Sequence, residues 1–566
     1  MTGSAVAGPA GRVVDHLVAA LADFGVRHVF GVDGANIEDL YDALFHSAAP
    51  ITGIVAKHEF SAATMADGAA RSTGRLGVVA ATSGGGALNL VAGLGEAFAS
   101  RVPVLALVGQ APTALEGHGA FQDSSGRSGT LDAVRLFAEV ARYCARIDRP
   151  EELGEHLTRA VSAAVRGGPA VLLLPKDVQQ SPLDPAAMRP IRPRPPRVVD
   201  KPGIARLALV LDRARRRGKV VVIAGDEVAR ADARAELADL VRVLDASVGV
   251  TPDAKDVVDP RTRGFCGLAG TMGHSELALA LRRSELCLLV GTRMPVLART
   301  GLDEALRACA IASLGHAPPH LPSAHAVTVD LRTSLAGLAR TLGPVGAAAA
   351  DGPAPRLSSL AVPESDGPGL RYRDAVRALD RHLPDGADVF VDAGNTGASV
   401  VHHLPVRRDG RFVVALGMGG MGYAFGAGIG SAFERRRRTV VIAGDGAFFM
   451  HGMEIHTAAQ HRLPVTFVVF NNNAHAMCVT RERLLYSDQY SFNRFEPSFL
   501  AAGVARMFPT VPAYAAATPD ELAAALHAVA RVAGPAFVEV LCDPDEIPPF
   551  LPFLPAAEPV PTGGVS

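Results

Sequence analysis

Residues 439–472 read TVVIAGDGAFFMHGMEIHTAAQHRLPVTFVVFNN and contain two apolar, strand-like runs. The first run ends at Gly444-Asp445-Gly446 and the second at Asn471-Asn472, which places Asp445 and Asn472 27 positions apart. In a parallel sheet, two strands that are joined by a helix have their carboxyl ends side by side. We therefore expect the Asp445 carboxylate and the Asn472 amide oxygen to meet at one edge of a sheet.

The chemistry of these residues predicts a site for a metal-bridged diphosphate. Carboxylate and amide oxygens are hard ligands that suit Mg²⁺, which usually keeps some positions for water and phosphate oxygens. Gly444 and Gly446 leave room for the backbone to approach a bulky anion closely. The alternative is an ordinary strand-to-helix turn with a capping Asp, followed by an Asn turn.

A second informative stretch lies near the N-terminus, where residues 56–98 read AKHEFSAATMADGAARSTGRLGVVAATSGGGALNLVAGLGEAF. Glu59 stands at the start of an Ala-rich run with helical character. Taken alone, Glu59 is better explained as an acid at a helix N-terminus, where the helix dipole favours it.

Together the two stretches resemble the cofactor motifs of thiamine diphosphate enzymes. The GDG…NN unit is similar to the metal and diphosphate motif of that family, and Glu59 falls on the glutamate of its pyrimidine-binding motif. The resemblance implies that Glu59 hydrogen-bonds a ring nitrogen of the aminopyrimidine and shares its proton. This favours the imino tautomer, which removes the thiazolium C2 proton.

The composition places the chain among ordinary globular proteins. Hydrophobic residues make up 48%, charged residues 20%, and the net charge is −1, so nothing favours nucleic acid or an anionic membrane surface as a partner. No apolar run approaches the roughly 18 residues of a membrane span, and the N-terminus lacks the pattern of a signal peptide.

The six cysteines lack metal-type spacing and predict reduced thiols in a cytoplasmic protein: Cys144, Cys266, Cys287, Cys309, Cys478 and Cys542.

Two stretches rich in proline or small residues, 181–202 and 342–369, predict linkers. They separate three blocks in which β-rich apolar runs alternate with Ala/Leu-rich helical patterns, a pattern typical of parallel sheets. We therefore predict an α/β protein with three parallel-sheet domains. The resemblance identifies them as a pyrimidine-binding domain (11–180), a central domain (203–342) and a diphosphate-binding domain (370–545).

Over nearly its whole length the chain is similar to the acetolactate synthase branch of the family. The string PVLALVGQAPTALEGHGAFQD matches a segment that carries a Phe-Gln pair into the active site, and ALGMGGMGYAFGAGIGSAF matches the glycine-rich turn of the diphosphate domain. The resemblance implies that Phe121 and Gln122 act beside Glu59 in catalysis. It also implies that Met421 wedges between the two cofactor rings, although a core methionine is the alternative.

The resemblance also implies a set of further roles, residue by residue. Cofactor contacts fall on Glu59, Asn395, Thr396, Gly419, Met421, Gly444, Asp445, Gly446, Ala447 and Asn472. For Asn395 and Thr396, a turn with a helix cap is an equal alternative. The metal ligands would be Asp445, Asn472 and the backbone carbonyl of Ala474, while Gly85 would lie near the substrate.

The chain departs from the acetolactate synthases at two places. Arg481 stands where that branch has a tryptophan in the acceptor pocket, and the chain contains no tryptophan at all. A guanidinium could bind a carboxylate or phosphate of the acceptor, or could pair with Glu482 or Asp488. Residues 291–295 read GTRMP in place of an RFDDR-like string that accompanies flavin binding, so FAD is not predicted, although the sequence does not decide the question.

The resemblance implies a carboligase that depends on thiamine diphosphate and Mg²⁺. Such an enzyme decarboxylates a 2-oxo acid, with pyruvate as the first choice, and transfers the acyl unit to a carbonyl acceptor. A simple 2-oxo acid decarboxylase and an inactive cofactor-binding subunit remain alternatives. The resemblance also implies a homodimer or homotetramer, with Glu59 from one subunit facing the metal motif of the other. Donor, acceptor and pathway stay open.

Overall fold

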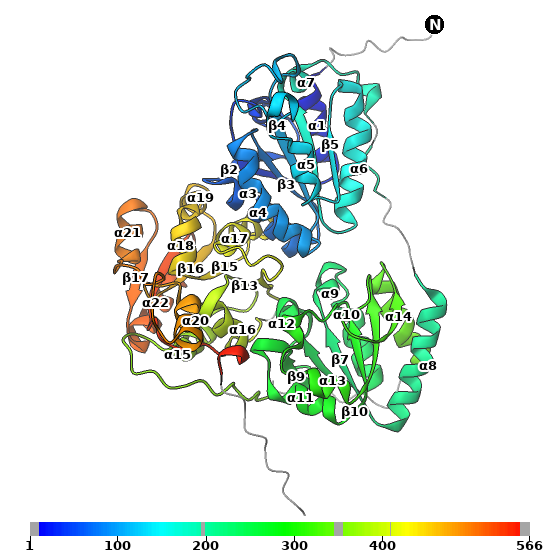
Figure 1. Ribbon diagram of the computed structural model, residues 1–566, viewed down its shortest axis with the longest axis vertical. Helices are drawn as coiled ribbons and strands as arrows, with labels where there is room; N and C mark the ends of the chain where they lie inside the picture. Colours follow the sequence, from blue (N-terminus) through cyan, green and yellow to red (C-terminus); the bar gives the residue numbers. More distant parts are fainter. Residues whose placement is uncertain (1–10, 189, 194–198, 344–354, 408, 555–566) are drawn as a thin grey trace, which may run out of the picture.

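The computed structural model describes residues 11–188, 190–193, 199–343, 355–407 and 409–554. Its strands form three six-stranded sheets in which every strand pairing is parallel, and helices flank each sheet (Figure 1). The predicted fold class of three α/β domains is therefore confirmed. Each sheet falls within one of the three predicted domain ranges, whose boundaries stay a prediction. None of the described helices is long and apolar enough to cross a membrane.

The N-terminal domain contains the first sheet, in the order β2-β1-β3-β4-β6-β5. Strands β4 and β6 consist entirely of buried residues, as expected for central parallel strands that helices cover on both faces. Its strands are β1 (His28–Val32), β2 (Thr52–Val55), β3 (Gly77–Ala81), β4 (Val104–Gln110), β5 (Tyr143–Arg146) and β6 (Pro169–Pro175). Its helices are α1 (Val13–Asp23), α2 (Glu38–His46), α3 (Glu59–Thr73), α4 (Gly85–Ala99), α5 (Ala133–Ala138), α6 (Leu153–Val165) and α7 (Lys176–Gln180).

The central domain contains the second sheet, in the order β12-β11-β10-β7-β8-β9. The order changes direction between β7 and β10, as in dinucleotide-binding folds. Its strands are β7 (Lys219–Ala224), β8 (Ser247–Val250), β9 (Phe265–Leu268), β10 (Ser284–Val290), β11 (Ala310–Gly315) and β12 (Ala324–Val327). Its helices are α8 (Lys201–Arg217), α9 (Asp226–Arg230), α10 (Arg234–Leu244), α11 (Ser275–Arg282), α12 (Val296–Arg299), α13 (Asp303–Arg307) and α14 (Leu331–Leu342).

The C-terminal domain repeats the strand order of the N-terminal domain, as β14-β13-β15-β16-β18-β17. The two domains therefore share one plan, a possibility that the sequence pattern left open. Its strands are β13 (Asp388–Val391), β14 (Phe412–Val414), β15 (Thr439–Gly444), β16 (Val465–Asn471), β17 (Ala513–Ala516) and β18 (Ala536–Leu541). Its helices are α15 (Tyr372–His382), α16 (Gly394–His403), α17 (Tyr423–Arg435), α18 (Asp445–His451), α19 (Ile455–Gln460), α20 (Ala476–Tyr486), α21 (Leu500–Met507) and α22 (Pro519–Val529).

Helices α3 and α17 join the N-terminal and C-terminal domains by direct backbone contact. A Cβ added to Gly68 of α3 would lie 2.1 Å from the carbonyl oxygen of Ala427, and one added to Gly430 of α17 would lie 2.0 Å from that of Met65. Side chains at these positions would force the helices apart. An ion-pair cluster reinforces the contact, because Glu434 at the end of α17 binds Arg27 at 2.5 Å and Arg75 at 2.8 Å.

Candidate active site

The structure brings the two halves of the GDG…NN motif together at one sheet edge. Strands β15 and β16 are adjacent and parallel, so Asp445 and Asn472 lie directly after neighbouring strand ends. The amide N–H of Ala474 lies 3.1 Å from both Asp445 Oδ2 and Asn472 Oδ1 and donates to each of them. Both side chains are buried. Two hard side-chain oxygens therefore lie close together at this edge.

The environment of this pair suits a bound cation. Burial raises the pKa of Asp445 to about 7, and the backbone N–H groups that donate to its carboxylate offset this only in part. Asn472 Nδ2 donates to the hydroxyl of Tyr372 at 2.8 Å, which orients the amide. A bridge between Ala474 and Arg494 uses the Asn473 carbonyl and the His475 N–H, and so does not engage the Ala474 carbonyl. Since the described residues contain no cluster of three or more His, Cys, Asp or Glu side chains that could hold a metal, a metal here would need such mixed ligands.

Next to this pair lies the point where the strand order of the C-terminal sheet reverses, between β13 and β15. In open α/β sheets, ligands bind outside the carboxyl ends of the strands at this point. Helix α16 begins here with Gly394, Asn395 and Thr396, and the N-terminus of a helix favours an anion. Asn395 Oδ1 is buried without a hydrogen-bond partner, and the Cβ position of Gly394 faces open space.

Strand-end glycines keep this crevice open. The nearest atom to the Cβ position of Gly444 is Thr396 Oγ1, at 3.8 Å. Gly446 is more crowded, since its Cβ would lie 2.5 Å from the His475 ring, and Ala447 is buried in the first turn of α18. The open glycine backbone and the oxygen pair together fit a metal-bound diphosphate.

Carboxylates from two domains hold the glycine-rich turn that carries Met421. Glu96 of the N-terminal domain accepts from the N–H of Met418 at 2.6 Å, and Asp392 accepts from that of Gly422 at 3.0 Å. Burial raises the pKa of Asp392 to about 6. Met421 is half-buried, and Gly419 within the turn has a left-handed φ of 66° with open space at its Cβ position.

Glu59 of the N-terminal domain follows β2, which is the edge strand next to β1. Glu59 is the first residue of α3 and is half-buried, and Asn89 Nδ2 donates to its Oε2 at 2.9 Å. A Cβ on Gly86 would lie 3.0 Å from Glu59 Oε1, so the start of α4 lies directly against the carboxylate.

The predicted catalytic neighbours of Glu59 lie around the end of β3. Gln122 Oε1 accepts from Thr82 Oγ1 at 3.3 Å, and its backbone has a left-handed φ of 58°. The Cβ position of Gly85 faces open space, and Phe121 beside Gln122 is 74% exposed. These residues therefore form an open rim around Glu59.

Arg481 lies on α20 with an exposed side chain, and its guanidinium carbon is 6.0 Å from the ring centroid of Phe553. Glu482, one of its two predicted alternative partners, is buried and accepts from Asn493 Nδ2. Arg481 thus lies where the short 3₁₀ turn Leu551–Phe553 meets α20.

Several residues of the site were not predicted from the sequence. Glu454 is buried in the C-terminal domain and accepts from the N–H groups of Lys57 and His58, which precede Glu59. The strand-like run of residues 387–391 precedes Asp392 and could have identified it as an acid at a strand end, and Glu96 stands within the quoted N-terminal string. No local pattern identifies Asn89, Glu454 or Tyr372, because their partners are distant in sequence.

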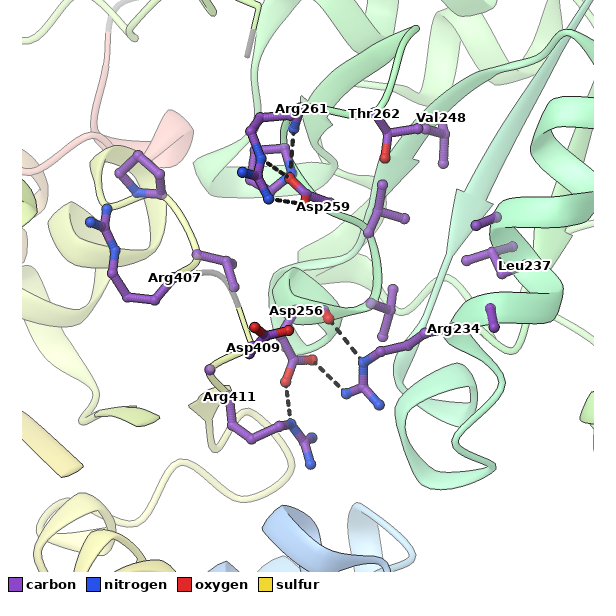
Figure 2. A pocket seen from close by; sticks show the side chains of 18 of the residues that line it. Arg234, Leu237, Val248, Asp256, Asp259, Arg261, Thr262, Arg407, Asp409 and Arg411 are labelled. Carbon is purple, nitrogen blue, oxygen red and sulfur yellow. Dashed lines mark hydrogen bonds and ion pairs between the residues drawn. The ribbon is translucent and has the colours of Figure 1, made fainter. Parts of the chain in front are cut away.

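A separate cavity of about 670 Å³ lies between the central domain and residues 405–407 and 409–411 (Figure 2). Its arginines are engaged by acids: Asp256 binds both Arg234 and Arg411, and Asp259 binds Arg261. It lies away from the sheet edges described above, and we assign no part of the site to it.

Comparison with known proteins agrees with this geometry. The family models described as "Thiamine pyrophosphate enzyme" match the chain in three parts: the N-terminal TPP binding domain at residues 11–128, the central domain at 204–342 and the C-terminal TPP binding domain at 392–540. The chain belongs to the thiamine pyrophosphate enzymes.

Similar curated proteins indicate which branch of the family this chain resembles. The chain is 28% identical to the "Probable acetolactate synthase large subunit" of Methanocaldococcus jannaschii, over 95% of this chain and 93% of that protein. It is also 28% identical to the "Acetolactate synthase isozyme 3 large subunit" of Escherichia coli (strain K12), over 84% of each chain. This thiamine diphosphate-dependent enzyme is therefore acetolactate synthase-like.

A solved structure supports the fold. It is described as a thiamin diphosphate-dependent enzyme from Mycobacterium smegmatis and superposes with a TM-score of 0.79 at 23% identity. The match covers 94% of this chain and 99% of the other.

Proposed function

We propose that the protein is a carboligase that requires thiamine diphosphate and Mg²⁺, decarboxylates a 2-oxo acid such as pyruvate, and transfers the acyl unit to a carbonyl acceptor. The buried Asp445–Asn472 pair carries the proposal, because its oxygens converge at a strand-order reversal beside an open helix N-terminus. Asp445, Asn472 and the Ala474 carbonyl would hold the metal. The N-terminus of α16, which includes Asn395 and Thr396, would receive the diphosphate.

Thiamine diphosphate, when bound, supplies an electron sink for the loss of CO₂. The chain's own residues bind, orient and exchange protons. The Glu59 carboxyl would exchange a proton with a ring nitrogen of the aminopyrimidine, while Asn89 keeps its second oxygen in place. Glu96 and Asp392 would fix the turn from which Met421 orients the two rings.

The proposed contacts with the 2-oxo acid come from the residues around Glu59. Gln122 would orient the 2-oxo acid, with Phe121 and the open backbone at Gly85 beside it. Arg481 would bind an anionic group of the acceptor, because an exposed guanidinium matches a carboxylate or phosphate.

The proposal includes a homodimer or homotetramer with active sites between subunits. Apolar side chains remain exposed beside both half-sites. Leu88 and Phe121 are 45% and 74% exposed near Glu59, and Phe449, Met450 and Met453 are 43–53% exposed just after Asp445. A second copy that covered these side chains would also complete the site. The domain ranges given above and a cytoplasmic location belong to the same proposal.

The test is a product analysis. Purified protein with thiamine diphosphate and Mg²⁺ is incubated with labelled pyruvate, alone and with a panel of 2-oxo acids and aldehydes, while CO₂ and new masses are followed. A carbon–carbon coupled product is expected, with higher yield for anionic acceptors. CO₂ with only free aldehyde would instead indicate a decarboxylase. Bound cofactor without turnover on any donor would indicate an inactive subunit.

A further inference from the structure

The central domain has the strand order of a dinucleotide-binding fold, and its order reverses between β7 and β10. A nucleotide would therefore lie outside the carboxyl ends of these two strands. Gly225 comes directly after β7, and Gly291 comes directly after β10. Whether this crevice can accept a ligand depends on what fills the space above these glycines.

The two loops close directly on each other. The N–H of Gly225 donates to the carbonyl of Val290 at 2.8 Å, and that of Glu227 donates to the carbonyl of Gly291 at 3.2 Å. A Cβ added to Gly225 would lie 2.4 Å from the Cβ of Thr292. The backbone groups that would approach a pyrophosphate are therefore occupied by the chain itself.

The side chain of Glu227 covers the neighbouring strand ends. A Cβ on Gly291 would lie 2.8 Å from the Cβ of Glu227, and one on Gly315, at the end of β11, would lie 3.0 Å from Glu227 Oε2. Glu227 therefore lies over β10 and β11, in the space that a bound ligand would need.

Acidic side chains, paired with Arg101 and Arg230, also take the place that a phosphate would need. Asp226 and Glu227 form the first turn of α9, where a dinucleotide fold places a second glycine and leaves the helix N-terminus free. A third carboxylate, Asp253, is half-buried after β8, and Asp226 repels it. With one glycine in the turn and three acids around it, the residues present do not fit FAD or another dinucleotide.

The partners of Glu227 give it a different role. Its Oε1 lies 3.2 Å from Arg101 Nη1 of the N-terminal domain, and its Oε2 accepts from the N–H of His316 at 3.0 Å. Arg230 lies 3.6 Å away on the same helix and donates to the carbonyl of Ser100 at 2.7 Å. The cavity beside this bridge holds about 230 Å³, below the range of about 300–1,000 Å³ that is usual for ligand pockets.

We infer that the Glu227 carboxylate fills the space in the central crevice where the phosphate of a nucleotide would lie. The crevice is therefore closed to nucleotides and flavins, and Glu227 instead anchors the N-terminal domain through Arg101. This inference does not depend on the proposed function.

The closure is tested by titrating the purified full-length protein with FAD and, separately, with ADP, up to about 1 mM. Calorimetry and the thermal unfolding midpoint are the readouts, together with the flavin absorbance of protein purified without added flavin. We expect no heat of binding, no shift of the midpoint and no flavin absorbance. Saturable binding of either compound at one per chain, or flavin that copurifies, would overturn the closure.

The anchoring is tested by a double-mutant cycle with Arg101→Gln and Glu227→Gln, which keep much of the side-chain shape. Each single variant should lower the first unfolding midpoint by about 2–4 °C, and the double variant should lower it by no more than one of them. Arg159→Gln and Glu155→Gln, an exposed pair on α6, serve as the control cycle, where shifts below about 1 °C are expected. Additive effects of Arg101→Gln and Glu227→Gln would overturn the anchor.

Discussion

The central and C-terminal domains are both built on parallel six-stranded sheets, yet their crevices differ in the residues that come directly after the strands. In the C-terminal domain, Gly394 faces open space and Gly444 has no neighbour closer than 3.8 Å at its Cβ position. In the central domain, Gly225 and Gly291 would meet atoms at 2.4 and 2.8 Å. The difference shows that a strand-order reversal supplies only a location. The strand-end residues decide whether that location is a binding site or a domain contact.

The largest expected effect comes from removing the carboxylate that distinguishes the open crevice. Asp445→Ala should weaken binding of thiamine diphosphate in the presence of Mg²⁺ by about 100-fold or more, because the proposed metal would lose its charged ligand. Calorimetric titration measures the effect. Glu227→Gln, the matched change at the closed crevice, should leave this affinity within about threefold. Equal losses in both variants would remove the distinction between the two crevices.

The next effect concerns chemistry rather than binding. Glu59→Gln should lower kcat by about 10²–10⁴-fold, since it keeps the hydrogen bond but cannot exchange the proton. Its affinity for the cofactor should stay close to that of the wild type. Steady-state rates and calorimetry on one preparation measure kcat and the cofactor affinity separately. Unchanged turnover would refute the role assigned to Glu59.

A smaller effect is expected at Arg481, whose side chain is exposed on α20. Arg481→Ala should raise the KM of an anionic acceptor by about 10-fold, because a charge-assisted hydrogen bond is lost. CO₂ release from the donor alone should change little. Arg506→Ala, on α21 of the same domain, is the control. A KM that does not change for any anionic acceptor would exclude Arg481 from the acceptor site.

A last effect, on stability rather than on binding or catalysis, is expected at the interface between the two compared domains. His402 of α16 contacts the Met272 carbonyl through Nδ1 and accepts from the N–H of Leu360 through Nε2. Burial lowers its pKa to about 4, and that of His274, stacked on it, to about 3. The unfolded chain takes up these protons near pH 6.5 while the folded chain resists them, so stability falls as the pH falls from about 6.5 to 4.

Replacing one of these histidines should flatten the pH dependence. Between pH 6.5 and 4.5, His402→Asn should lose about 2 kcal/mol less unfolding free energy than the wild type, as measured by urea denaturation. His46→Asn, at an exposed position, is the control and should behave as the wild type does. Identical slopes for wild type and His402→Asn would show that the interface does not exclude the proton.

Much of the fold could be predicted because the central strands are continuous apolar runs. Strands β4, β6, β15 and β16 are almost wholly buried, and their sequences show it. The strand-like runs of the sequence left out β2, β5, β8, β9, β11 and β17. Of these, β2, β5 and β17 are short and partly exposed, and each lies at the edge of its sheet, so they lack the apolar run that identifies a strand. Strands β8 and β9 have only four residues each, which is too short for a clear pattern.

Only some residues of the candidate site could be predicted from the sequence. Asp445 and Asn472 could be paired from their spacing, because one crossover connects adjacent strands. The contact of Glu96 with Met418 and that of Glu454 with Lys57 join different domains, so no local pattern could predict them. The closed central crevice could be suspected from the missing glycines, but the Glu227–Arg101 bridge depends on how two domains pack.

The most direct test of the comparison is a calorimetric titration of the metal-free wild-type protein with thiamine diphosphate, with and without Mg²⁺. We predict binding of one molecule per chain that requires the divalent cation, because the buried Asp445–Asn472 edge offers the diphosphate a site only through a metal. Binding of equal strength without any divalent cation, or no binding under either condition, would contradict the account.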